Sequence, residues 1–153
     1  MDDVRLMIDS LYSKDEKQAY NSLLQLEQIS EEANIVYPYF DTFAEMMFDN
    51  HYFIRLRGYR LLCKQAKWDN ENNIDRIIDD ILMQIEDEKP TAVRQKIKAL
   101  EDIVLYKKGL NNKIRQSILS FDCSKYKESM QSLILKDIER LISIIDKVDN
   151  INN

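Results

Sequence analysis

The chain is poor in the residues that make tight turns and reactive sites. Its 153 residues include two glycines, two prolines, two cysteines and one histidine. Sandwiches and barrels of many short strands need more turn residues, so the composition disfavours both folds. Cys63, Cys123 and His51 stand at none of the i, i+3 or i+4 spacings of metal ligands. We therefore expect neither a metal nor a cofactor.

Long apolar runs and an excess of positive charge are also missing. No apolar run approaches the roughly 18 residues that indicate a membrane-spanning helix, and the acidic start Met1-Asp2-Asp3 does not resemble a secretory signal. These features predict a cytoplasmic protein with reduced thiols and no membrane contact. The net charge of −5 argues against a nucleic-acid partner, because phosphate binding needs clustered lysine and arginine.

What the chain does contain is a helical repeat. Ile54-Arg55 begins an apolar helical run, and Val93-Arg94 begins a similar run 39 residues later, with fainter copies near Lys17 and Tyr126. A period of about 33–47 residues is typical of stacked helix pairs, which bury their apolar faces only against neighbouring pairs. We predict an all-α fold, an α-solenoid of about four helix pairs, in a single domain over 1–148. Residues 149–153 are predicted to be a frayed tail.

Apolar spacing and capping residues predict where the helices begin and end. Ser13 and Glu16 have the spacing of a capping box, and Pro90 suits the first turn of a helix that ends near Gly109. The expected helices cover 3–12, a run from Ser13, runs from Asn34, Asn50 and Asn72-Asn73, a run from Pro90, a short helix around Ile114 and Ile118, and 124–148.

Three strings carry a resemblance to a known family: Ile54–Asp69, Asp87–Leu100 and Lys125–Ile138. In the first two strings an arginine follows an apolar residue near the helix start, at Arg55 and Arg94, and this alternation of helix pairs resembles HEAT or armadillo-type repeats. More narrowly, they are similar to small bacterial HEAT-like proteins often labelled SufBD proteins, a name from iron–sulfur cluster assembly. The resemblance covers roughly Lys14 to Leu141 and implies an α-solenoid. Cluster scaffolding needs several converging thiolates or imidazoles, and the chain offers two isolated cysteines and one histidine.

Charge is distributed unevenly over the expected helices. The first helices are expected to be basic on their outer side, through Arg57, Arg60, Lys64, Lys67, Lys96 and Lys98. The second helices carry acidic residues, which the HEAT resemblance implies would line a concave side. We predict an acidic strip that binds a basic protein partner, formed by Asp41, Glu45, Asp75, Asp79 and Asp80. Asp41 and Asp80 are one repeat apart, and the simpler interpretation is that these are ordinary solvated faces.

Two other features have structural interpretations. Arg55 and Arg94 occupy equivalent repeat positions, and we expect them to pair with acids such as Asp49 and Glu88 rather than with a ligand. Trp68 stands at a joint between two helices, where packing of its ring is a simpler interpretation than an exposed binding anchor.

The sequence thus predicts a noncatalytic protein-interaction or scaffold module. Adjacent carboxylates such as Asp79 and Asp80 point about 100° apart on a helix, a poor geometry for shared acid–base chemistry. Glycine-rich phosphate loops and nucleophile elbows are absent from the sequence. Two alternatives remain open: a HEAT-like nucleic-acid binder or DNA-repair-type protein, and an accessory factor in iron–sulfur cluster assembly. The sequence leaves the oligomeric state open.

Overall fold

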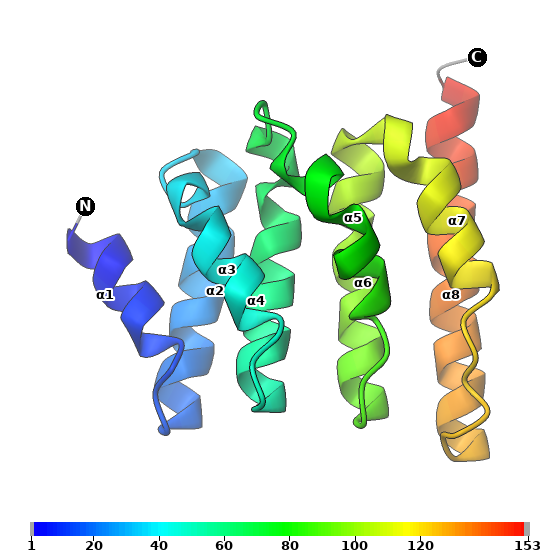
Figure 1. Cartoon of the computed structure of the whole chain (residues 1–153), viewed down its shortest axis with the longest axis horizontal. Helices are drawn as coiled ribbons and strands as arrows, with labels where there is room; N and C mark the ends of the chain where they lie inside the picture. The colour runs from blue at the N-terminus through cyan, green and yellow to red at the C-terminus, as the bar shows by residue number, and fades with distance from the viewer. Residues whose placement is uncertain (1, 152–153) are drawn as a thin grey trace. The chain divides into compact units, whose positions relative to one another are not determined.

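The computed structural model describes residues 2–151, and these residues form helices and connecting loops without a strand (Figure 1). The prediction of an all-α fold is confirmed. The α-helices are α1 (Asp2–Ser10), α2 (Glu16–Glu32), α3 (Phe40–Met46), α4 (Tyr52–Lys64), α5 (Asn73–Met83), α6 (Pro90–Tyr106), α7 (Asn111–Leu119) and α8 (Glu128–Ile151). Three short 3₁₀ turns are η1 (Tyr37–Tyr39), η2 (Gln65–Trp68) and η3 (Lys108–Leu110).

The chain divides into two compact units, an N-terminal unit of residues 1–73 and a C-terminal unit of residues 74–153. The boundary falls at the start of α5. At the other end of the C-terminal unit, α8 continues to Ile151, three residues beyond the Val148 at which we expected it to stop. Residues 152 and 153 of the predicted tail lie outside the described residues.

The N-terminal unit consists of two packed helix pairs. Helix α1 packs against α2, α3 packs against α4, and α2 also contacts α4. Gly58 brings α4 close to α3, because a Cβ atom at this position would lie 2.9 Å from the carbonyl oxygen of Phe43. The fully buried side chains of this core include Leu11, Leu23, Leu26, Phe43, Met46, Met47, Tyr59, Leu61 and Leu62.

In the C-terminal unit, α6 packs along α8 and α7 contacts α8. The buried core side chains include Ile74, Ile81, Val93, Ile97, Leu100, Val104, Ile114, Ile118, Ile134, Leu141 and Ile145. Most of these fall on the apolar stripes that the sequence predicts. The stripe of α5 is interrupted at Ile77, whose backbone is non-helical at φ −118° and ψ 19°, and this side chain is only half-buried.

Two predicted helix caps are wrong by one or two residues, whereas a third start is confirmed. Asp15 caps α2, with its Oδ1 accepting from the N–H groups of Lys17 and Gln18, while Ser13 Oγ accepts from the backbone N–H of Asp15 in the preceding turn. His51 caps α4 in place of Asn50, with Nδ1 accepting from the backbone N–H of Phe53 at 3.3 Å. Pro90 occupies the first turn of α6 as predicted.

Two cations that we expected on the surface are buried. Arg57 is 6% exposed and donates from Nη1 to the carbonyl oxygen of Leu11 at 2.8 Å, just after the end of α1. Lys96 is fully buried and donates from Nζ to the carbonyl of Gln84 at 2.7 Å and to Asp87 Oδ2 at 3.0 Å. The last carbonyls of a helix lack intrahelical donors and favour cations, which explains why both side chains turn inward.

Candidate functional site: two grooves in the C-terminal unit

The predicted acidic residues of the N-terminal unit are on the surface of α3. Asp41 and Glu45 are both exposed and one helical turn apart, while Phe40 and Phe43 of the same helix are buried. Partial burial raises the pKa of Tyr12, and nearby carboxylates, led by that of Glu45, raise it further. The carboxylates of Glu45, Asp49 and Asp9 therefore act together on the Tyr12 hydroxyl, and the acidic strip itself stays a prediction.

The predicted acidic residues of α5 are in the C-terminal unit and two of them carry lysine partners. Lys107 Nζ lies 2.7 Å from Asp75 Oδ1, and Lys113 Nζ lies 3.1 Å from Asp79 Oδ1. Asp80 is half-buried. The α5 surface is therefore a surface of paired charges rather than a bare acidic face. Stacking of Asp41 on Asp80 concerns different units and stays a prediction.

An open groove lies beside these acidic residues, between α5 and α7. We call it the α5–α7 groove; its volume is about 400 Å³ and it is lined by Asp79, Leu82, Met83, Lys113, Gln116, Ser117 and Ser120. Met83 is 68% exposed, an unusually large fraction for a methionine near the end of a packed helix. The groove thus combines an exposed flexible apolar side chain with the Asp79–Lys113 ion pair.

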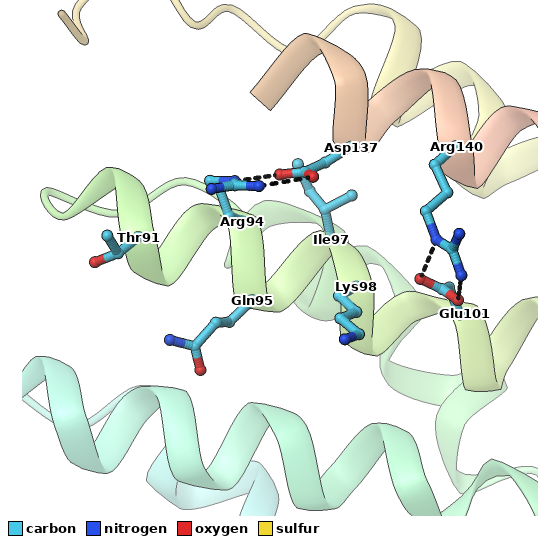
Figure 2. Close-up of a pocket in the computed structure, with 8 residues that line it drawn as sticks. All are labelled: Thr91, Arg94, Gln95, Ile97, Lys98, Glu101, Asp137 and Arg140. Carbon is cyan, nitrogen blue, oxygen red and sulfur yellow. Dashed lines mark hydrogen bonds and ion pairs between the residues drawn. The ribbon is translucent and has the colours of Figure 1, made fainter. Parts of the chain in front are cut away.

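A second groove lies between α6 and α8. We call it the α6–α8 groove; its volume is about 420 Å³ and it is lined by Thr91, Arg94, Gln95, Ile97, Lys98, Glu101, Asp137 and Arg140. Figure 2 shows two ion pairs that cross from one helix to the other. Arg94 Nε donates to Asp137 Oδ2 at 2.7 Å, and Arg140 Nε donates to Glu101 Oε2 at 3.4 Å. The hydrogen bond to Asp137 raises the pKa of Arg94.

Arg94 forms an ion pair with an acid, the kind of contact that we predicted for the repeated arginines, although its partner is not the example that we gave. Arg94 pairs with Asp137 of α8 rather than with Glu88. Arg55 donates to the backbone carbonyls of Asp49 and Asn50, at 3.0 and 2.8 Å. Sequence spacing identified the positions, but the partners depend on which helix lies opposite.

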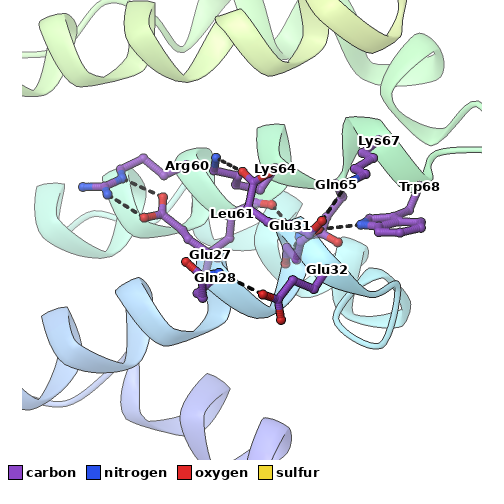
Figure 3. Close-up of polar contacts among 11 residues, drawn as sticks. Glu27, Gln28, Glu31, Glu32, Arg60, Leu61, Lys64, Gln65, Lys67 and Trp68 are labelled. Carbon is purple, nitrogen blue, oxygen red and sulfur yellow. Dashed lines mark hydrogen bonds and ion pairs between the residues drawn. The ribbon is translucent and has the colours of Figure 1, made fainter.

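The N-terminal unit has a corresponding contact between α2 and α4, which we call the α2–α4 seam. Figure 3 shows that donors of α4 and η2 meet acceptors of α2. Arg60 binds Glu27 through Nε–Oε2 and Nη2–Oε1 contacts of 3.0 and 2.7 Å, and Lys64 forms an ion pair with Glu31. The hydrogen bond from Lys64 lowers the pKa of Glu31.

The end of the same seam is closed by side chains that hydrogen-bond to Ser30. Gln65, which is fully buried, donates from Nε2 to Ser30 Oγ at 3.0 Å. Trp68 donates from Nε1 to the Ser30 carbonyl at 2.7 Å, and its ring is half-buried. This confirms the expectation that Trp68 packs at the joint between helices.

The soft-ligand residues do not come together. Cys63 is buried and Cys123 is half-buried, and the described residues contain no disulfide. Among residues 2–151 no group of three or more histidine, cysteine, aspartate and glutamate side chains is arranged to hold a metal ion. His51 serves instead as the cap of α4.

Comparison with protein-family models, with curated proteins and with solved structures gives no match. The resemblance to SufBD-labelled proteins therefore stays a prediction. None of the helices in the described part of the chain combines the length and the apolar character needed to cross a membrane.

Sequence reasoning missed Met83 and both acidic members of the α6–α8 groove. Met83 follows the apolar stripe of α5 and gives no signal that its side chain is exposed. The pair formed by Glu101 and Arg140 did leave a signal, because the two residues are 39 apart, which is the period inferred from the sequence. Charged pairs at the repeat spacing are therefore worth searching for in such sequences.

Proposed function

We propose that the chain is a noncatalytic protein-interaction module whose helix pairs form an α-solenoid of HEAT-like type. Support comes from the C-terminal unit, where three polar contacts join residues 39 apart: Arg140 with Glu101, Lys125 with Glu86, and Tyr126 with Asp87. This separation equals the spacing of Arg55 and Arg94. Contacts at the repeat period are expected when successive pairs stack in the same way.

The exposed Met83 in the α5–α7 groove carries the proposal that this surface binds protein. Methionine is flexible and polarizable, and it is common at surfaces that accept varied apolar side chains. Protein interfaces typically place such an apolar contact inside a polar rim, and here Asp79 and Lys113 supply that rim. The groove is therefore suited to a peptide or helix that inserts one apolar side chain.

The acidic residues of α5 define the charge of the expected partner. Asp75, Asp79 and Asp80 are the three carboxylates of α5, where Lys107 and Lys113 pair with two of them and Arg76 is a cation of the same helix. A partner with basic residues beside its apolar anchor would gain from contacts with the Asp79 and Asp80 carboxylates, mainly in association rate and specificity. We propose such a basic segment as the partner of the α5–α7 groove.

A peptide-display selection tests this proposal. A library of peptides about 12 residues long is selected on the immobilised protein, and the selected peptides are then measured by fluorescence anisotropy. We expect sequences with an apolar residue beside lysine or arginine, and we expect Met83→Ser to weaken their binding at least tenfold. Leu6→Ser is the matched control, because Leu6 is 63% exposed on α1 of the other unit.

Charge-neutral variants test the predicted acidic residues one unit at a time. The pair Asp75→Asn and Asp79→Asn should weaken binding and reduce its dependence on salt. The pair Asp41→Asn and Glu45→Gln makes the same change in charge on α3 and shows whether the N-terminal unit takes part. Peptides that bind equally well to the Met83→Ser protein would disprove the proposed site.

A further inference from the structure

The α6–α8 groove presents its arginines to solvent and holds its carboxylates further inside. The side chains of Arg94 and Arg140 are 37% and 68% exposed, whereas those of their partners Asp137 and Glu101 are 22% and 21% exposed. The acids are therefore less accessible to solvent than the arginines that they contact. This arrangement leaves the outer edges of both guanidinium groups accessible to solvent.

Each arginine uses only one edge on its carboxylate. Arg94 donates through Nε and Nη2 to Asp137, and Arg140 donates through Nε and Nη2 to Glu101. A guanidinium group has five N–H donors, and the structure gives the Nη1 groups no acceptor among the described residues. A second carboxylate can therefore bind the outer edge without displacing the first.

Lys98 adds a third cation to the same groove. It is exposed, it lies one turn after Arg94 on α6, and no acidic partner for it is found within residues 2–151. Three cations and two carboxylates leave the groove locally positive on a chain whose net charge is −5. Beneath them Ile97, 1% exposed, supplies an apolar floor.

We propose that the α6–α8 groove binds an acidic peptide segment of a partner protein, with Arg94, Arg140 and Lys98 contacting its carboxylates. Asp137 and Glu101 are positioning residues: Asp137 orients Arg94 through a 2.7 Å contact, and Glu101 orients Arg140 through longer contacts of 3.4 and 3.5 Å. The outer edges of the arginines give geometric specificity for carboxylates, because the paired N–H donors match their two oxygens. This site is separate from the α5–α7 groove. Its partner segment is acidic, whereas the segment proposed for the α5–α7 groove is basic.

An acidic peptide fits the groove better than a nucleic acid does. Nucleic-acid affinity comes mainly from neutralising many phosphates with clustered lysine and arginine. The groove has a small positive excess and carries two carboxylates of its own, which would repel a continuous polyanion. A short peptide places a few carboxylates on the arginines and leaves room for an apolar side chain above Ile97.

NMR titration of the ¹⁵N-labelled full chain with the peptide hexaglutamate tests the proposal. We expect shifts of the Arg94 and Arg140 Nε–Hε signals, and of backbone signals in 91–101 and 137–140, that saturate with a single dissociation constant. Hexalysine should leave these signals unchanged. Added sodium chloride should weaken the binding, because the contacts are partly exposed.

Matched variants separate specific binding from general charge effects. Lys98→Glu should raise the dissociation constant at least tenfold, whereas Lys147→Glu should change it less than twofold. Lys147 is exposed on α8 outside the groove, and both variants change the net charge equally. Arg94→Lys with Arg140→Lys keeps the charge but removes the planar donor pairs, and should weaken binding about tenfold.

Three outcomes would overturn the proposal. The first is an absence of saturable shifts with hexaglutamate, and the second is equal loss of binding in Lys98→Glu and Lys147→Glu. The third is tighter binding of a short oligothymidylate that shifts the same signals, which would make the groove a nucleic-acid site. Unchanged hexaglutamate binding by Met83→Ser shows that the result is independent of the α5–α7 groove.

Discussion

The α2–α4 seam and the α6–α8 groove use the same kind of contact, a cation of one helix on a carboxylate of another, yet one is closed and the other open. In the seam the donors come from α4 and η2 and the acceptors from α2. In the groove the pairs are reciprocal, with Arg94 of α6 on Asp137 of α8 and Arg140 of α8 on Glu101 of α6.

The difference comes from what fills the space between the helices. In the seam the small side chain of Ser30 admits the buried Gln65, and Trp68 closes the end. In the groove long charged side chains stand above Ile97, and a volume of about 420 Å³ stays open. Ion pairs between two helices therefore do not by themselves indicate a binding surface. Whether the space beside them is open depends on the neighbouring side chains.

Each unit also contains a buried cation that the sequence did not predict to be buried. Arg57 and Lys96 are 39 residues apart, and each donates to a carbonyl just after the end of an earlier helix. Lys96 also binds the carboxylate of Asp87, and both side chains are almost fully inaccessible at 0% and 1%. Each unit thus buries a cation at this 39-residue spacing, but the partners differ between the units, and so should the cost of removing the cation.

The largest effect is expected from Lys96→Ala. Removing this cation leaves the Asp87 carboxylate buried without its partner, which costs about 3–5 kcal/mol of unfolding free energy. Arg57→Ala leaves a neutral carbonyl unsatisfied and should cost about 1–3 kcal/mol. Urea denaturation followed by circular dichroism measures both.

The control is Lys96→Met combined with Asp87→Asn, which removes both charges and should recover part of the loss. Equal losses for Lys96→Ala and Arg57→Ala would break the distinction between the two buried cations.

The two glycines, one in each unit, differ in how closely other atoms surround them. Gly58→Ala places a Cβ against Met46 and the Phe43 carbonyl oxygen, and such overpacking typically costs about 1–3 kcal/mol. A Cβ atom at Gly109 in η3 would have no neighbouring atom within 4 Å, and the φ of this glycine is not positive. Gly109→Ala should therefore be neutral or stabilise by up to about 1 kcal/mol.

Melting temperatures measured side by side check both substitutions. A Gly58→Ala protein as stable as the parent would show that α3 and α4 can separate without loss, and the close contact would then be unimportant for the N-terminal unit.

The sequence predicted the helices better than it predicted the grooves, for a physical reason. Helix faces follow the apolar period, so Ile114, Ile118 and the start at Pro90 were found correctly. Periodicity treats every charged residue as exposed, so the burial of Arg57 and Lys96 was missed. Their burial depends on carbonyls at helix ends that lie far away in the sequence.

The acidic strip inferred from the sequence stays a prediction, although one of its residues, Asp79, lines the α5–α7 groove. The lysine partner of Asp79 comes from α7. Pairing between two helices depends on how they pack, and the apolar stripe of one helix does not specify that packing. The same holds for Arg140 and Asp137. In the sequence each is an ordinary charged residue, and its partner is known only once α6 and α8 are packed together.

A smaller effect is expected from Arg94→Ala in the open groove. Its side chain is 37% exposed, and exposed ion pairs contribute at most about 1 kcal/mol. Arg60→Ala in the closed seam removes two short hydrogen bonds from a side chain that is 20% exposed. That loss should be about 1.5 kcal/mol or more.

The measurement is the urea midpoint of each variant at low and high salt. Added salt should reduce the effect of Arg94→Ala more than that of Arg60→Ala, because exposed charges are screened more strongly. If Arg94→Ala proves the more destabilising change, the groove is a structural joint like the seam, and its proposed role in binding weakens.

The smallest effect concerns pH and the pair formed by Lys64 and Glu31 in the closed seam. The hydrogen bond from Lys64 lowers the pKa of Glu31 below its ordinary value of 4.5. A carboxyl group whose pKa is lower in the folded state stabilises the fold above its unfolded pKa, and this stabilisation disappears as the pH falls through the folded pKa. The melting-temperature difference between the parent and Glu31→Gln should therefore be positive and constant near pH 6–7. It should shrink below about pH 4.5 as Glu31 becomes protonated in both states.

Lys64→Met should produce a similar loss at neutral pH, and the double variant should lose less than the sum of the two. A difference that instead grows as the pH falls would show that Glu31 is stabilised in its protonated form, and would remove this ion pair from the contacts that close the seam.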